Sequence, residues 1–384
     1  MTKPRLLYVV TEDWAFLSHR LPMARAALEA GFEVHVATRV SKETDAAAIR
    51  ADGFILHHVP FARGRISPVS ALRTIAAIRA IHRAITPSIS HHVGLQPTVL
   101  ASLASLDSDA VCLNALTGFG FTFTSSSPKA VMLRPVLSRL LRLLLNRRNS
   151  QALVQNADDH AALLELGIEA SRIGLIEGSG VSLSAFTPMP EPSGAVTVGF
   201  VGRLLRDKGI TTLVAAHRKL RERGRDVRLA IAGFTDPANP SSVTDEQVNE
   251  WKRDPSIIVH GKIVDVARFW SQVHIAALPS RREGLPKSLI EAGACGRPLI
   301  AADVPGCRSV VIPDRTGLLV PVDDIDALAD AIDALVASAQ LRARLGAAAR
   351  ELTEQRFGEE LIATQILDLY GKLYPRGDGT SRAA

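Results

Sequence analysis

Two carboxylates stand eight residues apart in the segment Ser280-Arg-Arg-Glu-Gly-Leu-Pro-Lys-Ser-Leu-Ile-Glu-Ala-Gly-Ala-Cys-Gly-Arg-Pro-Leu-Ile-Ala301. The apolar run Ile275–Leu278 just before it predicts a buried strand, and Pro286 is expected at the first position of a helix. Glu283 then lies at the start of the helix and Glu291 lies inside it. Because doubly wound folds bind ligands where strands lead into helices, this segment predicts a binding site in an α/β protein.

The residues around the two glutamates decide between a ligand site and a solvated helix face. Gly284 has no side chain, so free N–H groups of the first helical turn can approach a phosphate or a sugar hydroxyl. The segment resembles the Glu-x7-Glu signature of the retaining glycosyltransferases of family 4, which have the GT-B fold. The matching residues are Glu283, Gly284, Leu285, Pro286, Glu291 and Ala292. The resemblance implies that Glu283 contacts the transferred sugar and Glu291 the nucleotide ribose.

A second match lies upstream, in Val198-Gly-Phe-Val-Gly-Arg-Leu-Leu-Arg-Asp-Lys-Gly209. It resembles the family's strand, its Gly202-Arg203 turn and its helix start at Lys208, where the cations hold the nucleotide diphosphate. The chemistry agrees, because the departing diphosphate develops negative charge that Arg203 meets with a fork of donors and Lys208 with a point charge. Cations near a helix N-terminus are unfavourable without an anion, which favours this role over a plain charged surface.

The organisation of the chain follows from its alternating apolar runs and longer helical stretches, which predict parallel sheets with helices on both faces. With 384 residues and 47% hydrophobic content, the chain can bury two cores. The expected fold class is therefore α/β GT-B, two Rossmann-like domains with parallel sheets that face each other across a cleft. Strands are expected at Leu6–Thr11, Glu33–Thr38, Ile55–Pro60, Ser88–Val93, Ala110–Ala115, Ala152–Asn156, Val196–Val201, Val227–Ala232, Ile257–His260, Ile275–Leu278 and Leu299–Ala302.

The stretch Thr187–Gly194 is rich in proline and predicts a linker. We expect an acceptor-binding domain at residues 1–187, a nucleotide-sugar-binding domain at 195–357, a helix at 358–374 that crosses back to the first domain, and a flexible tail at 375–384. The N-terminal apolar run is too short for a signal peptide, and no apolar stretch reaches the length of a membrane span, so a cytoplasmic location is expected. The three cysteines form neither a disulfide framework nor a metal-spaced cluster.

Positive charge is concentrated in the first half of the chain. Residues 60–150 carry eleven basic side chains against Asp107 and Asp109, a net charge of nine positive. Within this stretch, Arg134–Arg148 is typical of a basic amphipathic helix that lies on an anionic membrane surface. A helix whose leucines pack on the sheet fits equally well, and the two roles are compatible. Nucleic acid is a weaker explanation, because no aromatic side chains interleave these charges.

Further candidate contacts follow strands of the first domain. His91 and His92 lie near the end of an expected strand, and alternation sends them to opposite faces. The resemblance places one histidine of this kind beside the transferred sugar, and the sequence leaves open which of the two it is. The loop after the next strand contains Gly118 and Gly120 and is a candidate for contact with the acceptor or the sugar.

The segment Thr11–Pro22 contains His19, a further candidate contact, and resembles the branch of the family that elongates polyprenyl-diphosphate-linked saccharides. It departs from the glycine-rich first loop of many other members. Asp107-Ser-Asp109 matches the Asp-x-Asp pattern of metal-binding sites. It is expected in a turn just before a strand, where acidic residues are common. Gly178-Ser-Gly180 lacks the third glycine and the context of a dinucleotide fingerprint, so an NAD-dependent enzyme is not supported.

These patterns predict a retaining glycosyltransferase that needs no metal or other cofactor. It would move a hexose or N-acetylhexosamine from a nucleotide sugar, expected to be UDP-linked, to a polyprenyl-diphosphate-linked saccharide at the inner face of the membrane. Two alternatives remain: a nucleotide-sugar epimerase of the same fold, and a non-catalytic, membrane-associated scaffold for glycan assembly. The intact set of Arg203, Lys208, Glu283 and Glu291 argues against the scaffold.

Overall fold

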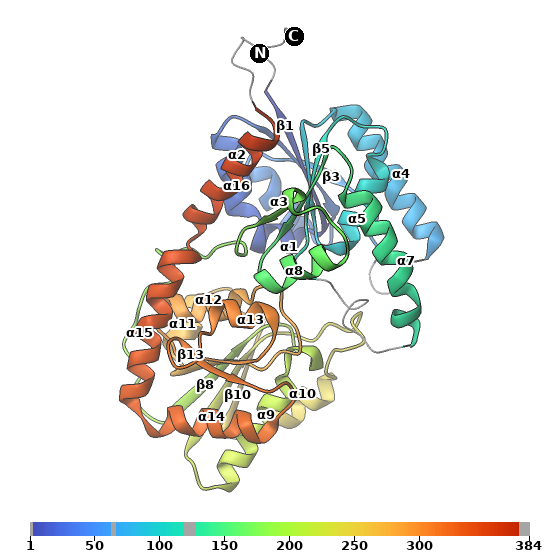
Figure 1. The fold of residues 1–384 in the computed structure, drawn as a ribbon. Coiled ribbons are helices and arrows are strands. Elements are labelled where there is room, and N and C mark those ends of the chain that lie inside the picture. The colour runs from blue at the N-terminus through green and yellow to red at the C-terminus, as the bar shows by residue number, and fades with distance from the viewer. Residues whose placement is uncertain (1–2, 63–66, 119–127, 376–384) are drawn as a thin grey trace. The chain divides into compact units, whose positions relative to one another are not determined.

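A computed structural model describes residues 3–62, 67–118 and 128–375 of the protein (Figure 1). The chain forms two compact units. The first unit combines Met1–Gly180 with Glu359–Ala384, and the second is Val181–Gly358. Each unit holds one parallel sheet with helices on both faces. The predicted α/β fold class with two Rossmann-like sheets is confirmed.

The sheet of the first unit has seven parallel strands in the order β3-β2-β1-β4-β5-β6-β7. The direction of chain progression reverses between β1 and β4, so the carboxyl ends of these two strands form the topological switch point of this unit. The strands are β1 Arg5–Glu12, β2 Glu33–Arg39, β3 Ile55–His58, β4 Ile89–Val93, β5 Val111–Ala115, β6 Ser150–Val154 and β7 Ile173–Leu175.

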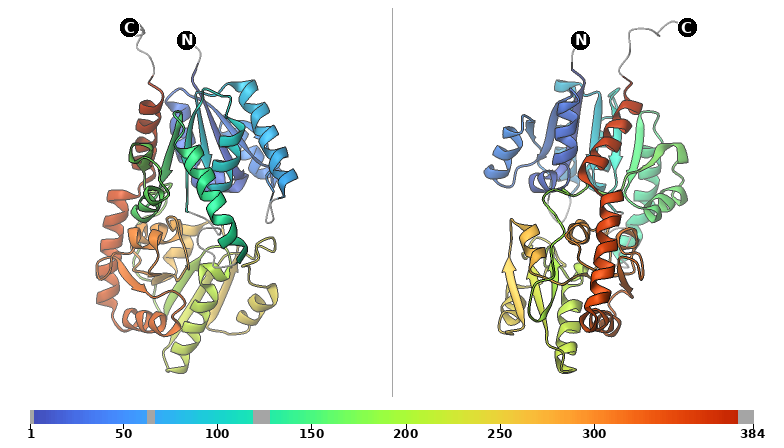
Figure 2. Two further views of the ribbon diagram at one scale, coloured as in Figure 1. Left: turned by 45° about the vertical axis from the view of Figure 1, so that its right-hand side comes forward. Right: turned by 90° about the vertical axis from the view of Figure 1, so that its left-hand side faces the viewer.

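The helices of the first unit include one from the far end of the chain. Helix α16 packs against α2, and Figure 2 shows the two side by side. The Tyr370 hydroxyl of α16 lies 2.8 Å from the Tyr8 hydroxyl of β1, inside the core. The helices are α1 Asp13–His19, α2 Leu21–Glu29, α3 Glu43–Ala51, α4 Pro68–Ile85, α5 Leu95–Ala104, α7 Pro128–Leu145, α8 Ala157–Glu165, the short η1 Ala170–Arg172 and α16 Glu359–Leu373.

The sheet of the second unit has six parallel strands in the order β10-β9-β8-β11-β12-β13, and it reverses between β8 and β11. Its strands are β8 Val196–Val201, β9 Val227–Ala232, β10 Ile257–Gly261, β11 Ile275–Leu278, β12 Leu299–Ala302 and β13 Gly317–Val320. Its helices are η2 Arg206–Lys208, α9 Ile210–Glu222, α10 Asp245–Trp251, α11 Val266–Ser271, α12 Lys287–Ala294, α13 Pro305–Val310, α14 Ile325–Ala337 and α15 Ala339–Arg356.

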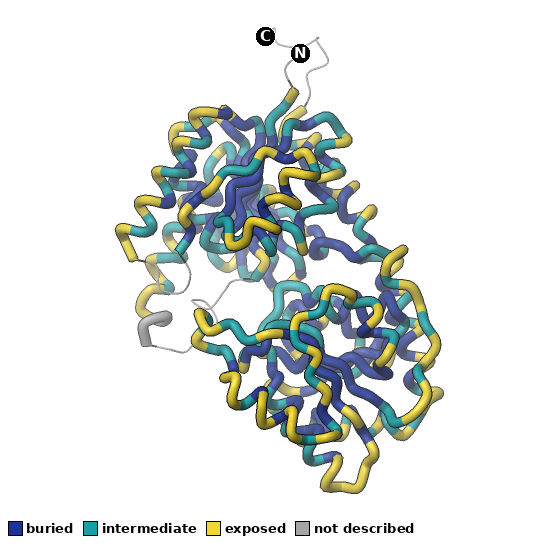
Figure 3. The backbone as a smooth tube through the Cα atoms, turned by 180° about the vertical axis from the view of Figure 1, so that it is seen from behind, coloured by how far each residue is buried: buried dark blue, intermediate teal, exposed yellow. Residues whose placement is uncertain are grey.

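The strands at the centre of each sheet are buried along their whole length, as the dark blue interior of each unit shows in Figure 3. In β1 the run Leu6–Val10 is at most 2% exposed, and every residue of β11 and β12 is buried. A parallel sheet covered by helices on both faces needs apolar side chains on both faces. This is why the sequence shows continuous apolar runs instead of alternation.

All eleven predicted strands are present, but two further strands in the described part of the chain escaped prediction. β7 has three residues and β13 has four, and each contains a glycine that weakens the apolar signal. At Gly317 the glycine is required, because a Cβ there would collide with the carbonyl oxygen of Leu299 on β12.

The proline-rich segment predicted as a linker lies inside the second unit, because the chain leaves the first unit after Gly180. Arginines hold the segment in place. Arg342 donates to both carboxylate oxygens of Glu191, at 2.7 and 2.8 Å, and Arg297 donates to the Pro190 carbonyl at 3.1 Å. The segment lies outside any strand or helix, so the Pro190 carbonyl accepts from a side chain instead of a backbone N–H.

Within residues 3–62, 67–118 and 128–375, no helix combines the length and the apolar character needed to cross a bilayer.

Candidate active site

The two sequence motifs of the second unit meet at its switch point. Strands β8 and β11 are paired, with Ile275 opposite Val198. The loop that leaves β8 carries Arg203, and the loop that leaves β11 carries Glu283. Open α/β sheets bind ligands in the crevice outside the carboxyl ends of strands at such a point. Two segments about 80 residues apart in the sequence therefore form one candidate site.

Asp207 ties the two loops together. Its carbonyl oxygen accepts hydrogen bonds from Ser280 Oγ at 3.0 Å and from the Arg281 backbone N–H at 2.8 Å. Its carboxylate accepts one from Arg282 Nη2 at 3.1 Å. These bonds fix the neighbouring Lys208 against the β11 loop. Sequence reasoning missed Asp207, since an acidic residue before the lysine is equally typical of a solvated turn.

Two glycines allow the loops to approach this closely. Gly209 has a φ of 73°, in the left-handed region, and a Cβ there would collide with the Pro279 carbonyl of the β11 loop. At Gly306, which begins the α13 helix with Pro305, a Cβ would collide with the carbonyl oxygen of Gly284. Larger residues at either position would displace the loop that carries Glu283.

Both cations of the site contact carboxylates. Lys208 Nζ donates to both oxygens of Glu283, at 2.6 and 2.8 Å, and the Glu283 side chain is only 8% exposed. Arg203 Nη1 donates to Asp236 Oδ2 at 3.1 Å, which uses one of the five N–H donors of the guanidinium. Asp236 lies in the loop after β9, next to β8 in the sheet. Sequence reasoning missed it because Asp-Pro is ordinary turn chemistry.

Glu291 lies within α12, which begins at Lys287 with Pro286 as its N-cap, one residue later than predicted. Burial raises the pKa of its carboxyl to about 7, and the nearby Lys287 opposes this only in part. Among the described residues, no group donates a hydrogen bond to this carboxyl. A buried acceptor in this state is suited to receive hydroxyl donors from a ligand.

His91 and His92 are both fully buried in the first unit, on opposite faces of β4 as alternation predicted. His91 Nδ1 lies 2.7 Å from the Tyr370 hydroxyl. His92 Nδ1 lies 2.8 Å from Asn114 Oδ1, and its Nε2 lies 2.9 Å from Ser90 Oγ. Burial lowers the pKa of both rings, that of His92 to about 3, so both are neutral at physiological pH. These contacts place both rings in the core of the unit.

The other candidates of the first unit lie apart from the histidine pair. His19 ends α1, is partly exposed, and has Nδ1 3.5 Å from Ser179 Oγ. Gly118 follows β5 with a φ of 120°. Gly120 lies outside the described residues.

Asp107 of the Asp-x-Asp sequence faces two arginines of α4. Its Oδ2 accepts from Arg83 Nη2 at 2.9 Å, and Arg79 Nε lies 3.6 Å from its Oδ1. Nowhere in the described parts of the chain do three His, Cys, Asp or Glu side chains gather as a metal ion requires. A carboxylate held by two cations serves the packing of α4 and the turn that follows α5.

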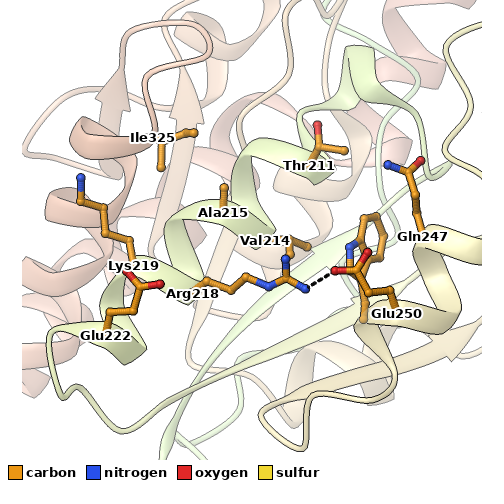
Figure 4. Close-up of a pocket in the computed structure, with 10 residues that line it drawn as sticks. Thr211, Val214, Ala215, Arg218, Lys219, Glu222, Gln247, Glu250 and Ile325 are labelled. Atoms are coloured by element: carbon orange, nitrogen blue, oxygen red, sulfur yellow. Dashed lines mark hydrogen bonds and ion pairs between the residues drawn. The ribbon is translucent and has the colours of Figure 1, made fainter.

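A groove on the second unit lies away from the two motifs. It has a volume of about 450 Å³ and lies between α9 and α10, with Val214 and Trp251 in its wall and the Arg218–Glu250 ion pair across it (Figure 4). None of Arg203, Lys208, Glu283 and Glu291 lines it. Cationic and acidic side chains occur in equal number around it, so it offers no clear electrostatic preference.

Comparison with solved structures defines the class of the fold. The chain superposes on the sucrose-phosphate synthase of Thermosynechococcus elongatus with a TM-score of 0.81 at 22% identity, covering 98% of this chain and 100% of the other. It superposes on Anabaena HepE, solved with UDP and glucose, with a TM-score of 0.76 at 17% identity, covering 95% and 99% of the two chains. The fold is GT-B.

Comparison with protein families then places the sequence. The family model described as glycosyl transferases group 1 matches residues 195–338, and the model described as glycosyl transferase 4-like matches residues 5–156. The chain belongs to these family 4-like glycosyltransferases, as the two motifs predicted.

Individual relatives cover the chain to different extents. It is 24% identical over 382 residues to the N,N'-diacetylbacillosaminyl-diphospho-undecaprenol alpha-1,3-N-acetylgalactosaminyltransferase of Campylobacter jejuni, covering 93% of this chain and 98% of that enzyme. It is 34% identical over 250 residues to a D-inositol 3-phosphate glycosyltransferase of Xylanimonas cellulosilytica and 26% identical over 182 residues to CapM of Staphylococcus aureus. These matches cover 59% and 47% of this chain and 58% and 47% of the relatives, about half the length of each.

Because the Glu291 carboxyl is buried, we expect the stability of the folded protein to depend on pH. Its pKa rises from 4.5 to about 7 on folding, so the folded state holds the proton more tightly and stability falls as pH rises through this window. Glu291→Gln removes the charge. We expect the variant to have a higher Tm than wild type at about pH 8 and a similar Tm at about pH 4, measured by thermal unfolding.

The exposed Glu222 of α9 provides the control, because Glu222→Gln changes the same charge at the surface and should leave Tm nearly unchanged at both pH values. A Glu291→Gln variant no more stable than wild type at the higher pH would show that the carboxylate is satisfied by groups in its surroundings.

Proposed function

We propose that the protein is a retaining glycosyltransferase that moves a hexose or N-acetylhexosamine from a UDP-linked sugar to a polyprenyl-diphosphate-linked saccharide. The observation that carries this proposal is the contact of Lys208 with Glu283 at the β8–β11 switch point, between the two motifs that also contain Arg203 and Glu291. The relative from Campylobacter jejuni, which matches along 93% of the chain, is named for an undecaprenyl-diphosphate-linked acceptor and supports this acceptor class.

Each of the four residues has a distinct role in the proposed reaction. Arg203 and Lys208 stabilise the charge that develops on the departing nucleoside diphosphate. Glu283, beside Lys208, accepts hydroxyl donors of the transferred sugar. Glu291, buried within α12 with no donor from the described residues, accepts the hydroxyls of the ribose. The two cations supply the stabilisation that a metal provides in other transferases, so the reaction is proposed to need none.

Helix α7 supports a role at an anionic membrane surface. One side of it is buried in the first unit through Leu141, Leu144 and Leu145. On the other side, four apolar side chains are each more than half exposed, at helical spacing with exposed arginines. The apolar residues are Met132, Leu133, Val136 and Leu143, and the arginines are Arg139 and Arg142. Exposed apolar side chains beside cations suit reversible docking on anionic lipid, which would bring the enzyme to its acceptor.

Removing either diphosphate contact should slow transfer. Arg203→Ala and Lys208→Ala are each expected to lower kcat by roughly a hundredfold, the scale of a lost transition-state donor. Radiolabelled-sugar transfer to a polyprenyl-diphosphate-linked acceptor measures this, and wild-type activity should persist in EDTA. Turnover within a fewfold of wild type in both variants would refute the assignment, and loss in EDTA that magnesium restores would refute metal independence.

Substitution of the two glutamates should have different effects on the affinity for UDP. Glu291→Ala is expected to weaken UDP and donor binding alike, because the ribose contact is common to both. Glu283→Ala should leave UDP affinity intact or raise it, because the loss frees the Lys208 ammonium, while transfer falls. Calorimetric titration of each variant with UDP measures this. An equal fall in UDP affinity in the two variants is incompatible with this division of roles.

Membrane docking through α7 should depend on its exposed arginines. Arg139→Gln with Arg142→Gln should weaken sedimentation with anionic vesicles by roughly thirtyfold, at about 1 kcal/mol per basic residue near the surface. Arg147 is left unchanged, because it donates to the Ser102 and Ser105 carbonyls at 3.2 Å and so serves the fold.

The matched control is Arg25→Gln with Arg50→Gln, which removes the same charge from exposed positions of α2 and α3. Transfer to a soluble acceptor should be unchanged in both double variants. If the α7 variant sediments like wild type, the exposed face of this helix does not hold the membrane.

A further inference from the structure

A buried arginine with almost no hydrogen-bond partners lies between α1 and α2. Arg20 is 3% exposed, and its two hydrogen bonds both come from Nη1, to the His19 carbonyl at 3.4 Å and to the Met23 sulfur at 3.7 Å. Both are long. Its Nε is buried with no partner. A buried guanidinium normally meets a carboxylate or several carbonyls, because leaving its donors unpaired is costly.

No carboxylate among the described residues compensates the charge of Arg20. Burial lowers the pKa of Arg20, and the ionisable groups that act on it are the hydroxyls of Tyr8 and Tyr370. Both hydroxyls are uncharged at neutral pH, because burial raises the pKa of each. Arg20 in turn contributes to the low pKa of His91. An uncompensated buried cation destabilises a fold, and positions that keep such a group are typical of functional sites.

His91 supplies a second buried donor in the same surroundings. The Tyr370 hydroxyl lies 2.7 Å from His91 Nδ1 and 2.8 Å from the Tyr8 hydroxyl, which accounts for one side of the ring. The other nitrogen, Nε2, is buried without a partner. The ring is neutral, so when Tyr370 donates to Nδ1, the proton of the imidazole is on Nε2. Arg20 Nε–H and His91 Nε2–H are then two unpaired donors.

His91 lies in one of the two central strands of the first unit, and Arg20 lies in the crossover that follows the other. Strands β1 and β4 are paired with Tyr8 opposite His91, and α1 follows directly where β1 ends. Arg20 is both the C-cap residue of α1 and the N-cap residue of α2, so the two helix dipoles oppose each other there and the guanidinium itself supplies the positive charge. Partly exposed His19 adjoins Arg20 in the chain. A buried cation without a counter-charge and a buried neutral donor without a partner together favour an anion.

We propose that Arg20 and His91 Nε2 form an anion-binding site of the first unit, and that its ligand is a phosphate of the acceptor's diphosphate. The choice of ligand rests on the proposed function, in which the acceptor carries a diphosphate. Free pyrophosphate shares the same chemistry. The site makes His91 a binding residue through Nε2, while Nδ1 anchors α16 through Tyr370.

The first test uses stability with inorganic pyrophosphate as the probe, in the presence of saturating UDP so that the donor site is filled. Arg20→Met removes an uncompensated buried charge and should raise Tm relative to wild type. Pyrophosphate should raise the Tm of wild type and have no effect on the variant. Arg25→Met is the control, because Arg25 lies on the same helix, is 55% exposed and pairs with Asp52 at 2.7 Å.

The second test is kinetic. Arg20→Met should raise the KM for a polyprenyl-diphosphate-linked acceptor roughly 10- to 100-fold, the effect of losing a hydrogen bond to a charged group. Hydrolysis of the donor alone and transfer to an acceptor analogue without phosphate should stay at wild-type rates. Arg20→Lys keeps the positive charge but lacks the paired N–H donors of the guanidinium, so it should give an intermediate KM. It also provides a folded variant if Arg20→Met fails to fold.

Three results would overturn the proposal. The first is an unchanged acceptor KM in both variants, and the second is an equal rise in the Tm of wild type and Arg20→Met with pyrophosphate. The third is a lower Tm of Arg20→Met together with loss of UDP binding, because this result would give Arg20 a purely structural role. Failure of the wild-type protein to use any diphosphate-linked acceptor would refute the proposed function instead, and the pyrophosphate measurement would still decide whether the anion site exists.

Discussion

The proposed donor site depends on the hydrogen bonds that the Asp207 carbonyl oxygen accepts from the β11 loop. This one oxygen accepts from the Ser280 side chain and the Arg281 backbone, so Lys208 and Glu283 are held in register across the switch point. The glycine at 209 makes the approach sterically possible. A site whose cation is positioned by backbone bonds needs little rearrangement when charge develops on a leaving group, which is the main source of electrostatic catalysis.

At two positions a proposed binding residue lowers the stability of the fold. Glu291 is a buried carboxyl whose ionisation is disfavoured, and Arg20 is a buried cation without a counter-charge. Lys208 and Glu283 instead neutralise each other. The paired residues cost the fold little, whereas the unpaired ones lower its stability and are explained only if a ligand satisfies them.

Much of the fold and the heart of the donor site could be predicted from the sequence, because both depend on local patterns. Continuous apolar runs such as Leu6–Val10 report strands buried on both faces, and the spacing of Glu283 and Glu291 reports a loop entering a helix. Asp207 and Asp236 could not be predicted, since their partners lie far along the chain and an acidic turn residue has the same local appearance in solvent. The linker prediction failed for the same reason, because the arginines that fix it are remote.

The two sheets have similar topologies, but the arginines proposed to bind anions in the two units differ in exposure to solvent. After the first strand of each unit the chain supplies an arginine, Arg203 beyond β8 and Arg20 at the start of α2. The Arg203 side chain is 35% exposed and shares one donor with Asp236, so it can exchange partners without moving the backbone. Arg20 is 3% exposed, so an anion can reach it only if side chains around α1 move. In the proposed reaction the donor site would therefore accept nucleotide readily, while the acceptor site would open only for a ligand whose binding compensates that movement.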